Sequence, residues 1–222
     1  METRTDILLQ KLAVVRRERH HVETQMQRRA ALMRQAFEKD PGRTPVHHAF
    51  EYKHNGHKWL CVVHVDAERT SQHALYWWTH SNGAHARYHA LEAILLRGSE
   101  RPLHFDSHFF SRYGKRHLLL RDRLTNLFAF FKQHYAMPIR GTGKLHRDLF
   151  AFAGAVPEGL VHAVLLRQKL ISCTTFLDHD HMRDDERALW LKLMRERGLP
   201  AEITLHATKD RHSPNDGRVV NW

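Results

Sequence analysis

The sequence predicts an α+β protein with a mainly antiparallel sheet, packed helices and a long N-terminal helical arm. Alternating apolar runs separated by short turns indicate hairpins, which pair strands in antiparallel fashion. Segments with apolar residues three and four apart indicate helices, and they are separated from the strand runs rather than alternating with them. Hydrophobic residues make up 42% and charged residues 27% of the 222 residues, as is usual for a globular chain.

Residues 5–39 are expected to form one helix, which ends at Asp40-Pro41-Gly42. Leu8, Val15 and Val22 recur every seven residues, and Leu12, Met26 and Met33 occupy the partner positions four residues further on. Together they form one apolar seam. Arg19 and Arg29 interrupt this seam, which favours packing against the body of the protein over an isolated coiled coil. Self-association through the arm is the alternative. We assign residues 1–40 to the arm, 41–208 to an α+β domain and 209–222 to a flexible tail.

Three strands are expected after the arm. Residues 46–53 and 58–65 flank an Asn-Gly pair, the strongest short-range signal for a hairpin. A two-residue loop at Asn55-Gly56 would pair Tyr52 with Trp59 and Phe50 with Cys61, which gives the hairpin one apolar face. Residues 72–80 form the third strand, whose aromatic run is available for stacking bases or for docking the arm. We predict a helix over residues 86–98, with a strand at its start as the alternative.

The central part of the chain predicts two helices and a loop. The first helix begins after Asp106 or Ser107, both good N-caps, and runs to about His117 with a weak point at Gly114. The second helix, about residues 118–135, carries an apolar stripe typical of a core helix. Residues 139–148 are expected to be a loop, and their Gly-Thr-Gly-Lys lacks the spacing of a phosphate-binding loop.

We expect three further strands, over residues 149–154, 159–167 and 170–177. A helix over residues 184–198 follows them, and residues 201–208 add an edge strand. Cys61 and Cys173 lie in apolar runs, which predicts buried free thiols. The sequence shows neither a signal peptide nor 18 consecutive apolar residues. We therefore expect a cytoplasmic protein without a membrane partner.

Positive charge is concentrated in the centre of the chain. The protein has a net charge of +11, and residues 97–147 hold 11 Lys and Arg against 3 Asp and Glu, so this block supplies +8 of the total. A concentrated basic block is the electrostatic footprint of a nucleic-acid-binding face. The expected partner is nucleic acid, RNA in preference to DNA.

The chemistry of the predicted site depends on a row of residues in the first central helix. His108, Arg112 and Arg116 are spaced by four and share one helix face. Metal-free RNA cleavage needs a group that exchanges protons near neutral pH, the role given to His108. It also needs cations for the phosphate, the role given to the two arginines. Secondary nucleic-acid contacts are predicted for His104, Tyr113, Lys115, Arg121, Arg140, Lys144 and Arg147. This mechanism requires no cofactor.

The segment Ser107–Arg116, "SHFFSRYGKR", resembles the His-x-x-x-Arg-x-x-x-Arg helix of bacterial ribonuclease toxins of the RelE/ParE and BrnT group. In this group such a helix packs against an antiparallel sheet, and the later segment "TTFLDHDHM" is similar to the closing strand. The resemblance implies a messenger-RNA endonuclease that is restrained by an antitoxin. This chain is about twice as long as such toxins and adds the N-terminal arm.

A second cluster supports a different hypothesis. Asp178, His179, Asp180 and His181 follow a predicted strand, and their carboxylates and imidazoles are ligand types for Zn²⁺ or Mn²⁺. A further ligand would come from His104, His108 or His146; alternatively, the cluster only caps the next helix. The sequence thus predicts a metal-independent endoribonuclease. The alternatives are a non-catalytic DNA- or RNA-binding regulatory protein of a mobile element and a metal-dependent nuclease.

Overall fold

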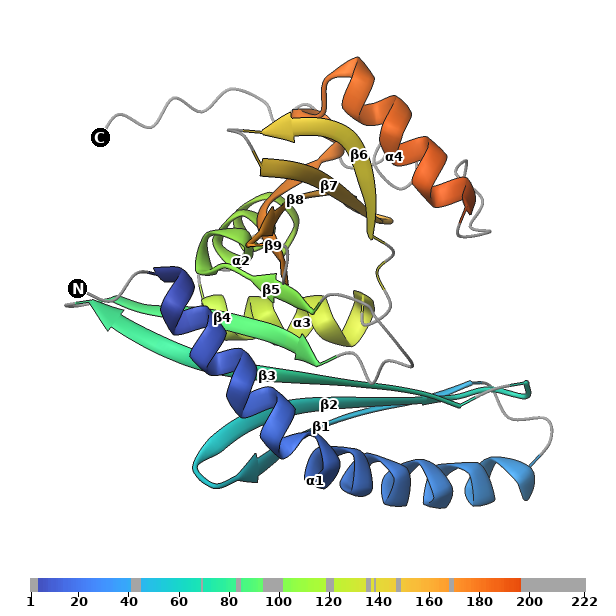
Figure 1. The fold of residues 1–222 in the computed structure, drawn as a ribbon. Helices are drawn as coiled ribbons and strands as arrows, with labels where there is room; N and C mark the ends of the chain where they lie inside the picture. Colours follow the sequence, from blue (N-terminus) through green and yellow to red (C-terminus); the bar gives the residue numbers. More distant parts are fainter. Residues whose placement is uncertain are drawn as a thin grey trace, which may run out of the picture.

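The computed structural model describes residues 4–40, 45–68, 70–82, 85–93, 102–118, 122–134, 137, 139–146, 149–167 and 170–196. Within these residues the chain forms four α-helices and one nine-stranded sheet (Figure 1). The helices are α1 (Arg4–Glu38), α2 (Ser107–Tyr113), α3 (Arg123–His134) and α4 (Asp184–Glu196). The strands are β1 (Val46–His54), β2 (His57–Val65), β3 (Thr70–Asn82), β4 (His85–Ala93), β5 (Leu103–Phe105), β6 (Ile139–His146), β7 (Leu149–Val156), β8 (Gly159–Leu166) and β9 (Leu170–Asp178). A π-helical turn, η1 (Gly114–Leu118), follows α2, and a 3-10 turn, η2 (His179–His181), precedes α4.

The sheet has the order β1-β2-β3-β4-β5-β9-β8-β7-β6. Neighbouring strands are antiparallel except for β5 and β9, which pair in parallel near the middle of the sheet. The sheet therefore consists of two meanders, β1–β4 and β6–β9, with the short strand β5 between them. This architecture confirms the predicted α+β class with a mainly antiparallel sheet and an N-terminal helix.

The first hairpin has the predicted register. Tyr52 pairs with Trp59 and Phe50 with Cys61 along β1 and β2. Asn55 and Gly56 have φ angles of 47° and 76°, and two residues with positive φ make the turn that matches the right-handed twist of the strands. Because the turn fixes which residues face each other, the sequence was sufficient to predict this hairpin.

Residues 85–93 form strand β4, so the predicted helix over residues 86–98 is wrong and the alternative strand is correct. Residues 94–98 lie outside the described part of the chain. The neighbours Ala90 and Leu91 are both buried, because α3 lies near one face of β4 and α1 packs on the other. A strand buried on both faces loses the alternation by which strands are recognised in a sequence.

The predicted loop over residues 139–148 is also wrong, because residues 139–146 form the edge strand β6. Its pairing with β7 shifts between Gly141 and Leu145, and Gly143 in this bulge has a φ of 71°. The Thr142 hydroxyl donates a 3.2 Å hydrogen bond to the Ala151 carbonyl across the bulge. Glycines are tolerated in an edge strand where a bulge needs them, so glycine content was a misleading signal for a loop.

The two central helices lie close to their predicted positions. Asp106 is the N-cap of α2 and its carboxylate accepts a 2.9 Å hydrogen bond from the His108 backbone N–H. The helix changes to the π-helical turn at Gly114, the predicted weak point. Helix α3 begins at Arg123 rather than near 118, and the Asp122 carboxylate accepts the backbone N–H of Thr125 at 2.9 Å.

The predicted C-terminal strands and helix are present as β7, β8, β9 and α4. The edge strand predicted over residues 201–208 and the tail 209–222 lie outside the described residues.

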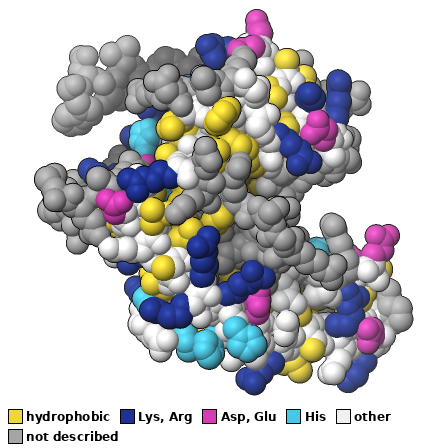
Figure 2. Space-filling view, viewed as in Figure 1, with side chains coloured by type: hydrophobic (Ala, Val, Ile, Leu, Met, Phe, Trp, Pro, Cys, Tyr) yellow, Lys and Arg dark blue, Asp and Glu magenta, His cyan; other side chains and the backbone are white. Residues whose placement is uncertain are grey.

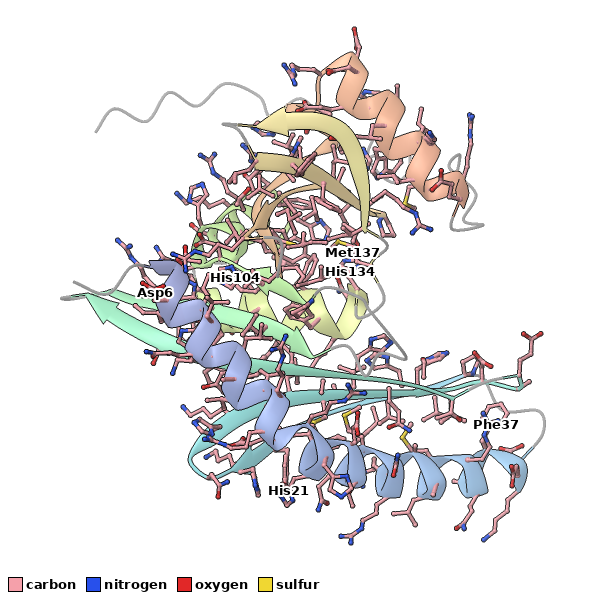
Figure 3. All side chains as sticks on the ribbon, in the orientation of Figure 1. Asp6, His21, Phe37, His104, His134 and Met137 are labelled. Carbon is pink, nitrogen blue, oxygen red and sulfur yellow. The ribbon has the colours of Figure 1, made fainter. Side chains whose placement is uncertain are left out.

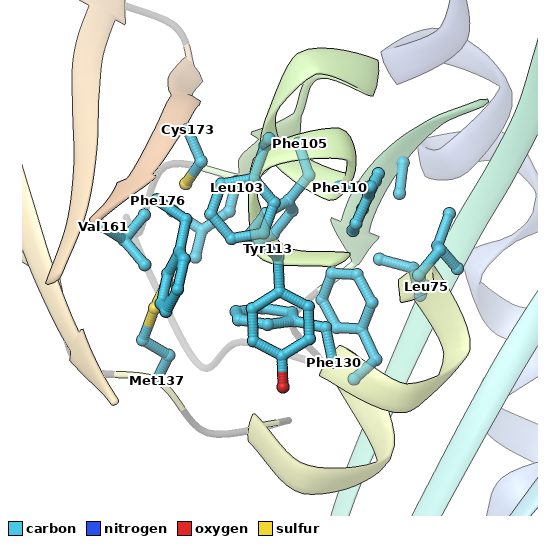
Figure 4. Packing of buried hydrophobic residues seen from close by; sticks show 14 of the residues in the cluster. Leu75, Leu103, Phe105, Phe110, Tyr113, Phe130, Met137, Val161, Cys173 and Phe176 are labelled. Atoms are coloured by element: carbon cyan, nitrogen blue, oxygen red, sulfur yellow. The ribbon is translucent and has the colours of Figure 1, made fainter. Parts of the chain in front are cut away.

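Both faces of the sheet are covered, and the main core lies between the two meanders. Helices α2 and α3 contribute the aromatic side chains Phe110, Tyr113 and Phe130, which pack on both meanders (Figure 4), and Phe109 belongs to the same core. Helix α1 covers the opposite face of β1–β4, and α4 covers the opposite face of β7 and β8 (Figure 1). The main core therefore holds α2 in position between the two parts of the sheet.

Helix α1 packs on its own sheet, as the interrupted seam suggested. Leu12, Val15, Val22 and Met26 are buried against β2, β3 and β4. The buried carboxylate of Glu18 lies in the same seam, 2.6 Å from Nδ1 of His57. Self-association through α1 stays a prediction.

Cys61 and Cys173 are buried thiols that form no disulfide within the described residues, as predicted. Burial raises the pKa of the Cys61 thiol to about 12, so this side chain behaves as a small apolar group. None of the described helices is both long and apolar enough to cross a membrane.

Candidate active site

A cavity of about 540 Å³ lies among the N-terminal ends of α1, α2 and α3 and the strands β3 and β4. Its apolar wall consists of Ile7 and Leu8 from α1 and Trp78 from β3. The rest of the lining is polar and comes from Arg87 and His89 of β4, from Arg123 of α3, and from Asp106, Ser107, His108 and Ser111 at the start of α2. The cavity thus joins an apolar surface to two imidazoles and two guanidinium groups.

His108 projects from the first turn of α2 into this cavity and is exposed. The Arg112 Nε–H donates a 3.2 Å hydrogen bond to Nε2 of His108, which therefore carries a lone pair. Partial burial, followed by the positive charges of Arg112, Arg116 and other cations around α2, lowers the pKa of His108. The ring is therefore neutral at neutral pH, as a proton-accepting group must be.

Arg112 and Arg116 continue the row along α2 and η1, as the spacing predicted. Nη1 of Arg116 donates a 2.5 Å hydrogen bond to the carbonyl of Phe176 in β9. Burial, followed by the charge of Arg112, lowers the pKa of Arg116. Arg116 therefore ties the π-helical turn to the sheet, whereas Arg87 and Arg123 are the arginines that line the cavity.

Two of the predicted nucleic-acid contacts are core residues instead. His104 and Tyr113 both have an exposed fraction of 0%. Tyr113 packs among Phe130, Phe176 and other aromatic rings (Figure 4), and His104 lies in the interior between the two meanders (Figure 3). Neither side chain offers a surface to a polyanion, because both are fully buried.

The other predicted contacts are distributed more widely. Lys115 is exposed next to the row, and Arg140 is exposed on β6, 3.9 Å from the carboxylate of Glu196 in α4. Arg121, Arg147 and the side chain of Lys144 lie outside the described part of the protein. On the face that Figure 2 shows, Lys and Arg side chains are spread over both meanders with acidic groups between them. The basic residues of the central block therefore do not all lie at one place.

Sequence reasoning missed His89, Arg87 and Arg123. Correct assignment of residues 85–93 as a strand would have placed Arg87 and His89 on one face of it. Nδ1 of His89 lies 3.4 Å from Nε2 of His104, whose Nδ1 lies 2.8 Å from Oγ of Ser172. No sequence pattern signals this row, because its members come from the three strands β4, β5 and β9.

The acidic and histidine cluster after β9 does not converge on one point. His179 is buried, with its Nε2 2.9 Å from the Pro157 carbonyl and its ring 4.5 Å from the Trp190 ring. Nδ1 of His181 forms a hydrogen bond with the Asp178 carboxylate. Across the described residues, no three His, Cys, Asp or Glu side chains are grouped closely enough to hold a metal ion. Asp178 to His181 serve instead as the connection between β9 and α4.

Comparison with models of protein families, with curated proteins and with solved structures found no match to this chain. The resemblance of residues 107–116 to the RelE/ParE and BrnT toxins stays a prediction.

Proposed function

We propose that this protein binds single-stranded RNA and cleaves it without a metal ion. The observation that carries the proposal is the cavity that joins His108 and His89 to Arg87 and Arg123. Imidazoles exchange protons near neutral pH, and fixed guanidinium groups stabilise the charge that grows on a phosphate during reaction. These are the groups that phosphodiester cleavage requires when no metal supplies the charge.

The proposed reaction uses the 2′-hydroxyl of the RNA as the nucleophile. His108 is suited to accept the proton of this hydroxyl, because its lowered pKa keeps Nε2 unprotonated. When substrate binds, Arg112 would release Nε2 of His108 and turn its guanidinium group to the phosphate. Nε2 of His108 would then accept the hydrogen bond of the 2′-hydroxyl. DNA lacks this hydroxyl, so the mechanism favours RNA as the substrate.

The shape of the cavity favours an unpaired nucleotide. A volume of about 540 Å³ accommodates one nucleotide but not a duplex. Ile7, Leu8 and Trp78 provide an apolar wall for a base in the same cavity as the cationic groups that suit the phosphate. The resemblance to the ribonuclease toxins adds messenger RNA as the substrate and an antitoxin as the partner of this proposal.

Cleavage of a labelled single-stranded RNA in EDTA tests the proposal. We expect wild-type protein to cut it and His108→Ala to cut it about 100-fold more slowly. His20→Ala is the matched control, because His20 is an exposed histidine of α1 more than three turns from the cavity-lining Leu8.

Two results would contradict the proposal. Equal rates for wild-type protein and His108→Ala would remove His108 from the reaction. Salt-sensitive RNA binding with no cleavage by the wild type would support a non-catalytic nucleic-acid-binding protein instead.

A further inference from the structure

We infer that His89 is a second proton-transfer residue, the general acid of the proposed RNA cleavage, and that His104 and Ser172 are the positioning residues behind it. This inference rests on the proposed function. It extends that function from a single histidine to a pair, of which one accepts a proton and the other gives one.

The row runs across three neighbouring strands. His104 of β5 is the register partner of Ser172 in β9, and on its other side β5 pairs with β4, which carries His89. Nδ1 of His89 lies 3.4 Å from Nε2 of His104, and Nδ1 of His104 lies 2.8 Å from Oγ of Ser172. His104 and Ser172 are buried, whereas His89 reaches the cavity. The row thus leads from the interior of the sheet to the surface on which the substrate would lie.

The contacts along the row allow a chain of hydrogen bonds that directs one proton of His89 inward. If the Nδ1–H of His104 donates to the Ser172 hydroxyl oxygen, Nε2 of His104 carries a lone pair and accepts the Nδ1–H of His89. His89 then exchanges protons through Nε2 alone, in either charge state. His104 stays neutral throughout, which avoids the cost of a charge at a fully buried position.

The rings of the row are also nearly parallel to one another. The Trp78 and His89 rings are stacked, with their centroids 5.5 Å apart and an angle of 14° between their planes. The rings of His89 and His104 are inclined by only 11°. A positioned ring loses little freedom when substrate binds, which is what orientation contributes to catalysis.

The proposed step is an in-line displacement at phosphorus with one proton transfer at each end. Nε2 of His108 takes the proton of the 2′-hydroxyl, O2′ forms a bond to phosphorus, and the bond from phosphorus to O5′ breaks. Protonated His89 gives its Nε2 proton to the departing O5′, and the negative phosphate favours this protonated form before reaction. The products are a 2′,3′-cyclic phosphate and a free 5′-hydroxyl end. His108 gains the proton of the 2′-hydroxyl and His89 loses its own proton to O5′, so the pair divides the roles of base and acid.

A change of leaving group tests the assignment. We compare a dinucleotide RNA with uridine 3′-(4-nitrophenyl phosphate), whose nitrophenolate departs without needing a proton. We expect His89→Gln to lower kcat for the dinucleotide about 100-fold with little change in KM, and to be close to wild type on the aryl ester. His108→Ala stays slow on both substrates, because the 2′-hydroxyl must still lose its proton.

The positioning residues are tested in the same assays. Ser172→Ala removes the acceptor for His104, so we expect a loss in kcat for the dinucleotide of about tenfold and none for the aryl ester. Ser172→Thr keeps a hydroxyl and restores the rate. A loss that is equal for the two substrates, or equal in the Ala and Thr variants, indicates a structural role and overturns the positioning assignment.

Failure of the inference is distinguishable from failure of the proposed function. If wild-type protein is active and His89→Gln has an unchanged kcat, His89 is not the general acid. The proposed function then still stands. Wild-type protein that cuts neither substrate overturns the proposed function and the role of His89 with it.

Discussion

At the scale of single residues, Gly114 lies where α2 and its π-helical turn pack tightly against Asn126 of α3. A Cβ atom at this position would lie 1.9 Å from Nδ2 of Asn126, which is buried in α3. The backbone at Gly114 has ordinary helical angles, with a φ of −62°, so space rather than conformation requires the glycine.

We therefore expect Gly114→Ala to lower the free energy of unfolding by about 1–3 kcal/mol, the usual cost of overpacking a core. Asn126→Ala in the same chain should return part of this loss, because it removes the atoms with which the new methyl group clashes. Urea denaturation of the single and the double variant measures the loss and its partial recovery. Gly141→Ala is the control, since its nearest neighbour would lie at 3.8 Å; a loss there of equal size would contradict the explanation.

The same scale shows which part of the candidate site the sequence could predict. Helical spacing placed His108 and Arg112 on one face, and the structure joins them by a hydrogen bond. Arg123 belongs to another helix and His89 to a strand that was predicted as a helix. Their approach to His108 is decided by tertiary packing, which no local spacing encodes.

At the scale of elements, Glu18 attaches α1 to β2. The carboxylate lies 2.6 Å from Nδ1 of His57 and accepts the indole N–H of Trp59 at 3.3 Å. The side chain is buried, so water cannot replace these contacts when they are lost.

Replacement of Glu18 by Ala should therefore lower the free energy of unfolding by about 1.5–3 kcal/mol, the range for hydrogen bonds to a charged group. Glu23→Ala, which breaks a more exposed pair with Arg19 on the same helix, should cost less than about 1 kcal/mol. Thermal or urea unfolding compares the two. Equal losses would mean that α1 is held by its apolar seam alone.

The two wrong secondary-structure predictions also belong to this scale. Strand β4 is buried on both faces around Ala90 and Leu91, and β6 carries glycines because it is an edge strand with a bulge. In both cases the position in the sheet, which local sequence does not reveal, outweighed composition. The hairpin β1–β2 and the helix α1 were predictable because each is determined by residues close together in the sequence.

At the scale of the whole molecule, contacts between distant segments connect the two meanders and the central helices. Glu158, in the turn between β7 and β8, lies 2.9 Å from Nε2 of His134 in α3 and 3.9 Å from Nε2 of His117. Burial alone would raise the pKa of Glu158, but its contact with His134 and the charge of His117 outweigh burial and lower the pKa.

A carboxylate with a lowered pKa in the folded state stabilises the protein above its pKa in the unfolded chain, about 4.3. That stability is lost as the pH falls through the lowered value. We expect Glu158→Gln to be less stable than wild type near pH 6, and the difference to shrink as the pH falls below about 4. Thermal unfolding from pH 3 to 7 measures it, with exposed Glu51→Gln as the control. A difference that does not change with pH would exclude this charge contact as its origin.

The parallel pairing of β5 with β9 has a consequence for synthesis on the ribosome. Residues 103–105 leave the ribosome well before residues 171–173, so β5 must wait for its second neighbour while α2, α3 and three more strands emerge. Until then β5 presents an unpaired edge, and the hydroxyl of Ser172 is absent from behind His104. The nascent chain would thus complete the wall of its cavity before Ser172 can support His104 and, through it, His89. Any activity that depends on this support begins only after β9 has joined the sheet.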